Sequence, residues 1–234
     1  MAFLLSSCRK EDKNEFGQLN NIVFNTSLTY GTMEDQDGNT YKTIKIGDQT
    51  WMAENLKTTK YNDGTSIPNI KDDDAWTTCV EGYCWFNNDI SFKKVYGALY
   101  SPGTIKTGKL APTGWHIPND LEWETLRQYA GGEYGAGFNL RESGVLHWDW
   151  SSKHGYTSSN NAINALGFTA LPGGSRSPDG LCLWMLSEGH WWSCNQNGDN
   201  IYLSNWSMFT DDSFLSAEFI NYNLGVSVRC VKNN

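Results

Sequence analysis

The sequence predicts an α+β domain that is rich in turns. Its 234 residues include 11 Trp, 11 Tyr, 10 Phe and 23 Gly, whereas charged residues make up only 19%. This mixture is typical of loop-rich folds and not of helical bundles. Segments in which apolar and polar residues alternate, as they do in β-strands, occur near both ends of the chain. The helical patterns cluster in the middle. Such segregation favours an α+β architecture over alternating βαβ units.

Residues 119–130 carry the clearest helical pattern. Asn119 or Asp120 can cap a helix, and with Asn119 as the N-cap, Glu122 takes the third helical position. That spacing predicts a capping box, in which each side chain satisfies a backbone amide of the other residue. Glycines at 131 and 132 then end the helix. One apolar stripe, made of Trp123, Leu126 and Ala130, predicts that this helix packs on a core.

The strands are predicted from alternation and turn residues. Residues 33–52 indicate a hairpin or meander, with turns at 35–39 and 47–48. Asp35, Asp37 and Asn39 have the spacing of a calcium loop, but Ile46 stands where such a loop needs a bidentate carboxylate, so we interpret the segment as a turn. Residues 135–141 indicate a second short helix or a turn. Further strands are expected at 167–174, 181–186, 190–195, 200–204, 217–221 and 225–232.

Charge and hydropathy exclude two classes of function. The formal net charge is −8, and the sequence shows no basic stripe, so binding of nucleic acid through its phosphates is not expected. After the N-terminus, no apolar run is long enough to span a bilayer.

Residues 1–8 resemble the end of a bacterial lipoprotein signal. Leu5, Ser6 and Ser7 precede Cys8 as in a lipobox, so we expect a lipid on Cys8 and an outer-membrane lipoprotein, with more basic and apolar residues encoded upstream of Met1. The alternative is a chance cysteine after an apolar hexamer. The charged residues 9–14 resemble surface-export signals of Bacteroidetes lipoproteins. We therefore expect a signal remnant over 1–8, a tether over 9–32 and one domain over 33–234.

A series of segments in the chain resembles the Fibrobacter succinogenes major paralogous domain, a family of bacterial secreted and lipoprotein modules. The segments are 46–57 (IGDQTWMAENLK), 84–89 (CWFNND), 96–100 (YGALY), 112–118 (PTGWHIP) with Glu122 and Trp123, 167–174 (GFTALPGG) with Arg176, 191–193 (WWS) and 225–230 (GVSVRC). The later half also resembles formylglycine-generating-enzyme domains. These resemblances imply a C-type-lectin-like fold with a twisted antiparallel sheet, one or two helices and long loops on one face.

The cysteine spacings predict two local disulfides. Gly82 allows a tight return between Cys79 and Cys84, and a hairpin of 181–186 with 190–195 would place Cys182 opposite Cys194. The sequence contains no C-x-x-C pair of the kind that would indicate a zinc site.

The fifth cysteine, Cys230, is treated differently because of the resemblance. The family usually has a cysteine before the 112–118 segment, which would pair with the terminal strand, but Ala111 stands there in this chain. The resemblance therefore implies that Cys230 is a free thiol, and we expect it to be buried.

The chain lacks a recognisable catalytic constellation. His116 is the best single candidate for catalysis, but its neighbours indicate a packed helix entry. His147, Asp149 and His154 are interpreted as a solvated loop. The cysteine pair on which formylglycine-generating enzymes depend is not matched. We therefore expect no enzyme but a binding or adhesion module, with a formylglycine-generating-like or carbohydrate-active enzyme as the alternative.

The expected ligand is a glycan or a protein partner at the cell surface. Neither Glu-Pro-Asn nor Gln-Pro-Asp occurs, so the usual calcium-dependent sugar motif is absent; no cofactor is assigned, and calcium is left open. Aromatic faces can stack on sugar rings without a metal. Four tryptophans are assigned to the core, namely Trp51, Trp115, Trp123 and Trp192. The candidates for ligand contact are Trp148, Trp150, Trp184 and Trp206.

Overall fold

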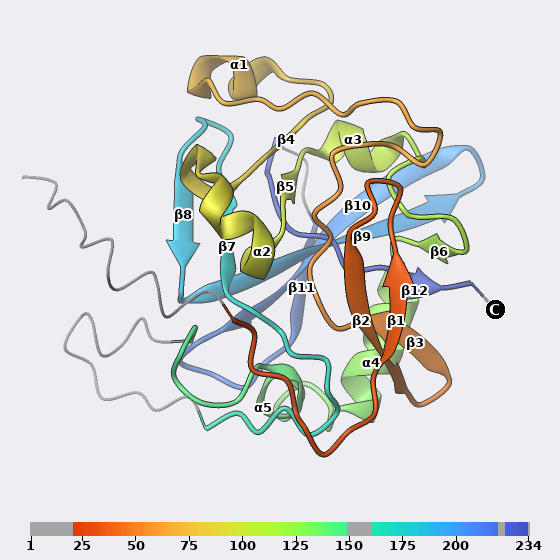
Figure 1. Ribbon diagram of the computed structural model, residues 1–234, viewed down its shortest axis with the longest axis vertical. Coiled ribbons are helices and arrows are strands. Elements are labelled where there is room, and N and C mark those ends of the chain that lie inside the picture. Colours follow the sequence, from red (N-terminus) through yellow and green to blue (C-terminus); the bar gives the residue numbers. More distant parts are fainter. Residues whose placement is uncertain (1–20, 149–160, 220–222, 234) are drawn as a thin grey trace, which may run out of the picture.

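The computed structural model describes residues 21–148, 161–219 and 223–233, and it is an α+β fold with short helices. One five-stranded sheet has the order β1-β2-β3-β12-β6, and a second has the order β11-β10-β9-β7-β8 (Figure 1). A third, two-stranded sheet pairs β4 (Tyr83–Cys84) with β5 (Leu99–Tyr100). In the described ranges, no helix is both long and apolar enough to cross a bilayer.

The first sheet begins as the predicted meander. Strands β1 (Gly31–Glu34), β2 (Thr40–Ile46) and β3 (Gln49–Met52) pair antiparallel. The turn before β2 is held by the Asp35 carboxylate, which accepts from the amides of Asp37 and Asn39 and from the Tyr41 hydroxyl. These bonds occupy the carboxylate and confirm the turn. The sheet is completed by β12 (Val231–Lys232) and β6 (Trp115–His116).

The second sheet is built on a long hairpin. Strands β9 (Glu188–Asn197) and β10 (Asn200–Phe209) are in register over their whole length, and β11 (Ser216–Phe219) extends them. Strand β7 (Gly173–Arg176) runs parallel to β9 on the other side. The edge strand β8 (Cys182–Met185) pairs with β7, so the predicted pairing of 181–186 with 190–195 is wrong. The signal that was missed is the turn at Asp179 and Gly180, which closes the β7–β8 hairpin.

The helix α4 (Asp120–Tyr129) confirms the predicted helix and its capping box. Asn119 accepts from the amide of Glu122, and the Glu122 carboxylate accepts from the amide of Asn119 at 2.9 Å each. The second predicted helix is α5 (Ala136–Leu140). Further short helices are α1 (Asp73–Thr78), α2 (Lys93–Tyr96) and α3 (Pro102–Lys106), with 3-10 turns η2 (Phe86–Asn88) and η3 (Ile90–Phe92).

The segment 224–233 connects all three sheets. Gly225 forms a bridge with Arg176, Val226 with Tyr100, and Ser227 with Trp191. Further along, the carbonyl oxygen of residue 228 accepts from the amide of Leu56, and that of residue 230 accepts from the amide of Met52. The segment then ends as β12. The predicted strand at 225–232 is therefore an extended segment that changes partners, and only its end is a regular strand.

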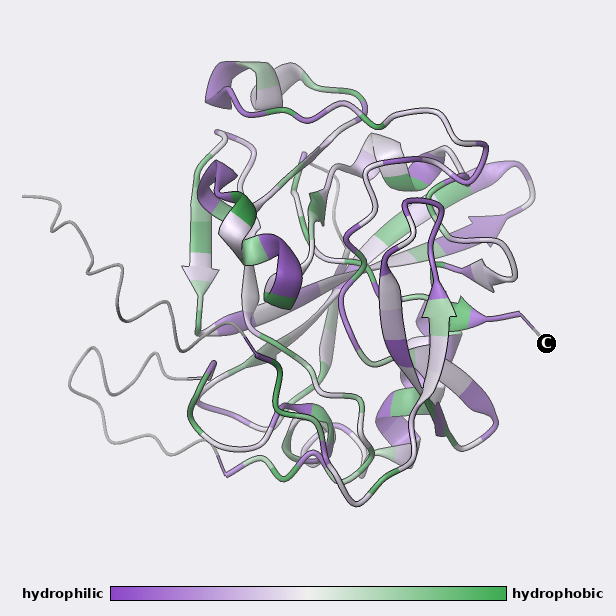
Figure 2. Ribbon diagram, viewed as in Figure 1, coloured by the Kyte–Doolittle hydropathy of each residue, from purple (hydrophilic) through white to green (hydrophobic). Residues whose placement is uncertain are grey.

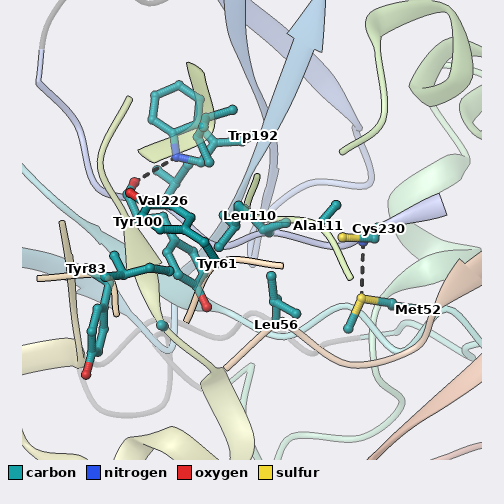
Figure 3. Packing of buried hydrophobic residues seen from close by; sticks show 14 of the residues in the cluster. Met52, Leu56, Tyr61, Tyr83, Tyr100, Leu110, Ala111, Trp192, Val226 and Cys230 are labelled. Carbon is teal, nitrogen blue, oxygen red and sulfur yellow. Dashed lines mark hydrogen bonds between the residues drawn. The ribbon is translucent and has the colours of Figure 1, made fainter. Parts of the chain in front are cut away.

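The core lies between the sheets and is largely aromatic. Trp51, Trp123 and Trp192 are fully buried, as predicted. Hydrophobic residues also reach the surface: Figure 2 shows β8 as a mostly hydrophobic edge strand. Figure 3 shows part of one buried hydrophobic cluster, to which both Ala111 and Cys230 belong. Cys230 carries a free thiol and is completely buried.

The shared cluster of Ala111 and Cys230, together with the family resemblance, generates a prediction. Replacing Ala111 by Cys is expected to form a disulfide with Cys230 and to raise the thermal midpoint. The closed loop would have about 120 residues, for which chain entropy gives a ceiling of about 4–5 kcal/mol. Mass spectrometry under non-reducing conditions and thermal melts with and without reductant check this. The double variant A111C/C230A should gain no reductant-sensitive stability. Two free thiols at 111 and 230 in a folded A111C protein would contradict the prediction.

Candidate functional site

Two of the predicted ligand-contacting tryptophans are core residues. Trp148 is 1% exposed, and its indole N–H donates to the carbonyl oxygen of Ala170 at 2.9 Å. Trp206 is 3% exposed, stacks on Trp123 and donates to the Asp120 carboxylate at 2.8 Å. Both assignments to a ligand surface are therefore corrected. The reason is tertiary, because each indole packs in the core and donates to an acceptor that is distant in the sequence.

The other candidates divide between the surface and the part of the chain outside the described residues. Trp184 lies on the edge strand β8 and is 48% exposed, with a positive φ of 66°. Trp150, Cys8, Asp149 and His154 lie outside the described residues. His147 was expected in a solvated loop, but it is buried and contacts the Glu142 carboxylate through Nδ1 at 2.5 Å.

The expected disulfides are absent among the described residues, where Cys79, Cys84, Cys182, Cys194 and Cys230 are free thiols. Cys182 and Cys194 are not opposite each other, because β7 separates β8 from β9. The sulfur of Cys79 accepts from the side-chain amide of Asn223 at 3.5 Å. Cys84 instead contacts Cys182. The pairings Cys79–Cys84 and Cys182–Cys194 are therefore corrected.

A cleft of about 580 Å³ lies where the entry to α4 meets the end of the β9–β10 hairpin. Figure 1 shows β6, α3 and this end of the hairpin on the same side of the molecule. The apolar part of its lining comes from Ile105, Ala111, Trp115, Ile117, Leu121, Cys194 and Ile201. The polar part comes from Asn62, His116, Asn119, Asn195 and Gln196, and Gly108 completes the lining.

Local structure fixes the positions of these side chains. Trp115 is placed by β6, whose register pairs it with Lys232. Asn119 is held because its Oδ1 caps α4. Asn195, on β9, accepts from the amide of Asp120 and donates to the Asp120 carboxylate, at 2.8 Å each. The cleft is therefore built from the helix cap and the hairpin, which are tied together through Asp120.

Several polar atoms of the lining have no partner within the described residues. They are the amide nitrogen of Asn119, the amide oxygens of Asn62 and Gln196, and the indole N–H of Trp115. The other atom of each side-chain amide is hydrogen-bonded. The oxygen of Asn119 accepts from the Glu122 amide, the nitrogen of Asn62 donates to the Ala111 carbonyl oxygen, and the nitrogen of Gln196 donates to that of Gly198. Each amide is thus oriented by the protein and presents one free hydrogen-bonding atom.

His116 is clamped on both sides. Its Nε2 contacts Glu122 Oε1 at 2.7 Å, and its Nδ1 contacts Asn233 Oδ1 at 2.8 Å. The hydrogen bond to Glu122 raises the pKa of His116 above its ordinary value of 6.5, although burial opposes it. Burial would raise the pKa of Glu122, but the bonds from His116 and from the Asn119 amide hold that pKa below 4.5. The pair therefore favours the charged forms of both residues.

The two ionisable side chains that line the cleft are His116 and Cys194. Both nitrogens of His116 are engaged, so neither is free to move a proton to or from a substrate. Burial raises the pKa of Cys194, which favours the thiol over the nucleophilic thiolate. Among the described residues, no group of three His, Cys, Asp or Glu side chains could hold a metal ion.

Sequence reasoning missed most of this site. Trp115 was assigned to the core, but it is only half-buried and lines the cleft. Asn62, Asn195 and Gln196 were not singled out, because their approach to the helix cap depends on the sheet order. The available signal was the 112–118 segment itself, which placed Trp115 and His116 directly before the cap.

The paired ionisation of His116 and Glu122 predicts a pH-dependent stability. A raised histidine pKa contributes stability below about pH 6.5 that is lost as pH rises through the folded-state value. The lowered Glu122 pKa contributes stability above about pH 4.5 that is lost at lower pH. The stability difference between wild type and His116→Gln should therefore be largest near pH 5–6, and smaller at pH 9 and pH 3.

Because the His116–Glu122 pair is partly exposed, the difference in the free energy of unfolding between wild type and His116→Gln should stay below about 1 kcal/mol. Urea unfolding across this pH range measures it. In a protein that already carries Glu122→Gln, the effect of His116→Gln on the free energy of unfolding should depend much less on pH. A difference that is the same at pH 5.5 and pH 9 would contradict the pairing.

The comparisons with known proteins agree with the series of segments on which the resemblance was based. The model of the Fibrobacter succinogenes major domain matches residues 44–232, from within β2 to the end of β12. No curated protein and no solved structure matches the chain. The match covers more than half of the sequence and includes the cleft. The chain therefore belongs to the Fibrobacter succinogenes major domain family.

Proposed function

We propose that this protein is a non-catalytic binding module of the cell envelope and that its ligand is a glycan bound in the cleft beside Trp115. The observation that carries the proposal is the lining itself. It combines a half-buried indole with oriented amides and contains no Lys, Arg, Asp or Glu side chain.

An uncharged ring with many hydroxyl groups suits this lining. The face of an indole stacks on the apolar face of a sugar, and Ile117 and Ile201 extend the apolar floor. The free amide atoms of Asn62, Asn119 and Gln196 supply both donors and acceptors, which hydroxyl groups can match. A phosphate or a carboxylate would find no lysine or arginine in the lining.

The amides are also fixed before a ligand arrives. Asn119 is part of the helix cap, and Asn195 is bonded to Asp120. Side chains that are already ordered lose little conformational entropy on binding, which favours affinity for a weakly interacting ligand such as a sugar.

The proposal keeps the C-type-lectin-like fold and the lipid anchor. The fold is supported by the curled antiparallel sheet in which β12 joins the N-terminal meander beside β3. The anchor is supported by the lipobox-like residues before Cys8. An anchored module would present its cleft to polymers outside the cell.

A formylglycine-generating-like or carbohydrate-active enzyme is the alternative function. It would require a free acid or base in the cleft, whereas His116 and Glu122 are bonded to each other. A protein partner bound through the exposed side of β8, around Trp184, is the other alternative.

Binding of glycans to matched tryptophan variants tests the cleft. We expect the soluble domain to bind a subset of sugars on a glycan array and Trp115→Ala to weaken this binding roughly 10-fold or more, because the stacking surface is removed. Trp184→Ala is the matched control and should bind as wild type does. Thermal melts verify that both variants are folded.

Three outcomes would contradict the proposal. Loss of binding in Trp184→Ala with retention in Trp115→Ala would place the ligand on β8. Turnover of a bound sugar that is lost in Glu122→Gln would favour the enzyme. An array without any bound glycan would leave no support for a sugar ligand.

Lipidation of Cys8 is tested separately. When the full gene is expressed in its bacterial host with a labelled fatty acid, the protein should carry the label and fractionate with the outer membrane. Cys8→Ser should lose the label, whereas Cys79→Ser should keep it. An unlabelled wild-type protein in the soluble fraction would contradict the anchor.

A further inference from the structure

Two cysteines that are far apart in the sequence meet between the small sheet and the edge of the second sheet. Cys84 ends β4, and Cys182 begins β8. Both belong to one hydrophobic cluster with Trp76, Phe86 and Leu99, and a hydrogen bond joins their thiol groups. The two sulfurs are therefore in contact while both remain free thiols.

The surroundings of Cys182 stabilise a thiolate. The backbone amide of Asn87 donates to its sulfur at 3.2 Å, and Arg176 is its partner in the β7–β8 register. The hydrogen bond from Cys84 has the largest effect and, with the Asn87 amide and the charge of Arg176, lowers the pKa of Cys182 to about 7, although burial opposes this. Its side chain is only partly buried, so a small reagent can reach it.

Cys84 has the opposite character. It is fully buried, and both its hydrogen bond to Cys182 and its burial raise its pKa well above the ordinary value. One accessible sulfur that ionises near neutral pH therefore contacts one protected sulfur that does not. An attacking thiol and a resolving thiol differ in this way in proteins that exchange disulfides.

We propose that Cys84 and Cys182 are a redox-active pair that closes to a disulfide on exposure to a small-molecule disulfide, and so ties β4 to the edge strand β8. The Cys182 thiolate attacks the disulfide, forming a mixed disulfide and releasing one thiolate, which takes up a proton. The Cys84 sulfur then loses its proton and attacks the Cys182 sulfur, and the second small thiol leaves. Two protein thiols are oxidised, and one small disulfide is reduced to two thiols.

The bond would fix an element that is otherwise held at one side only. Strand β8 pairs with β7, and within the described residues no strand pairs with its other side. Closing a loop of roughly a hundred residues is expected to raise the thermal midpoint by on the order of 10 °C.

The test uses the purified chain in buffers of reduced and oxidised glutathione. After alkylation of free thiols, peptide mapping without reductant should show a crosslink between the peptides of Cys84 and Cys182 in oxidising buffer and its loss in reducing buffer. Cys182→Ser should abolish the crosslink. Cys79→Ser is the matched control from the same cluster and should keep it.

Other results would overturn the inference. One is a mixed disulfide on Cys182 that persists while Cys84 stays alkylatable. Another is a crosslink that joins Cys79 to either cysteine. A third is a wild-type protein that retains both thiols in fully oxidising buffer. These outcomes are read on the wild-type chain, so they do not depend on the folding of a variant.

Discussion

The guanidinium of Arg229 is fully buried between the two large sheets. It donates to the side-chain oxygen of Asn55 at 2.8 Å and to the carbonyl oxygens of Phe168 and Thr169. Within the described residues no carboxylate forms an ion pair with it, and burial lowers its pKa to about 9. A buried charge without a counter-ion is costly unless its donors are satisfied. The faces of Phe168 and Trp191, at 4.4 and 5.8 Å from the guanidinium carbon, add cation–π attraction.

This requirement determines how neighbouring segments are arranged. The Asn55 side-chain oxygen accepts from Arg229 and from the Trp191 indole, while its nitrogen donates to the Tyr96 carbonyl oxygen and to the Ser227 hydroxyl. One buried amide therefore joins the segment after β3, the end of α2, β9 and the segment 224–233. Displacing any of these segments would leave a buried polar group without a partner, which costs more than the hydrogen bond itself contributes.

Local features of this fold could be predicted from the sequence, and non-local ones could not. The capping box at Asn119 and Glu122 and the meander predicted over 33–52 depend on residues a few positions apart, and both are found. Strand order depends on the whole chain. For that reason β8 was assigned to β9, Cys182 to Cys194, and Trp206 to the surface. The side of the sheet on which Trp115 and Asn195 meet depends on the same long-range choice, so the cleft was missed. The family resemblance succeeded because its segments include Asn55, Trp191 and Arg229, which meet in the core.

The position of the segment 224–233 has a consequence for the order in which the molecule is assembled. A chain is synthesised and emerges from the ribosome N-terminus first. Domains generally fold as units once enough of the chain has emerged. Here the strand that joins β3 to β6 in the first sheet, the partner of Tyr100 in the small sheet and the buried guanidinium all come from this late segment. The meander, the β9–β10 hairpin and α4 can form earlier, but they lack the element that joins them. The core is therefore completed only after the segment 224–233 has been synthesised, because the elements formed before it lack their shared partner.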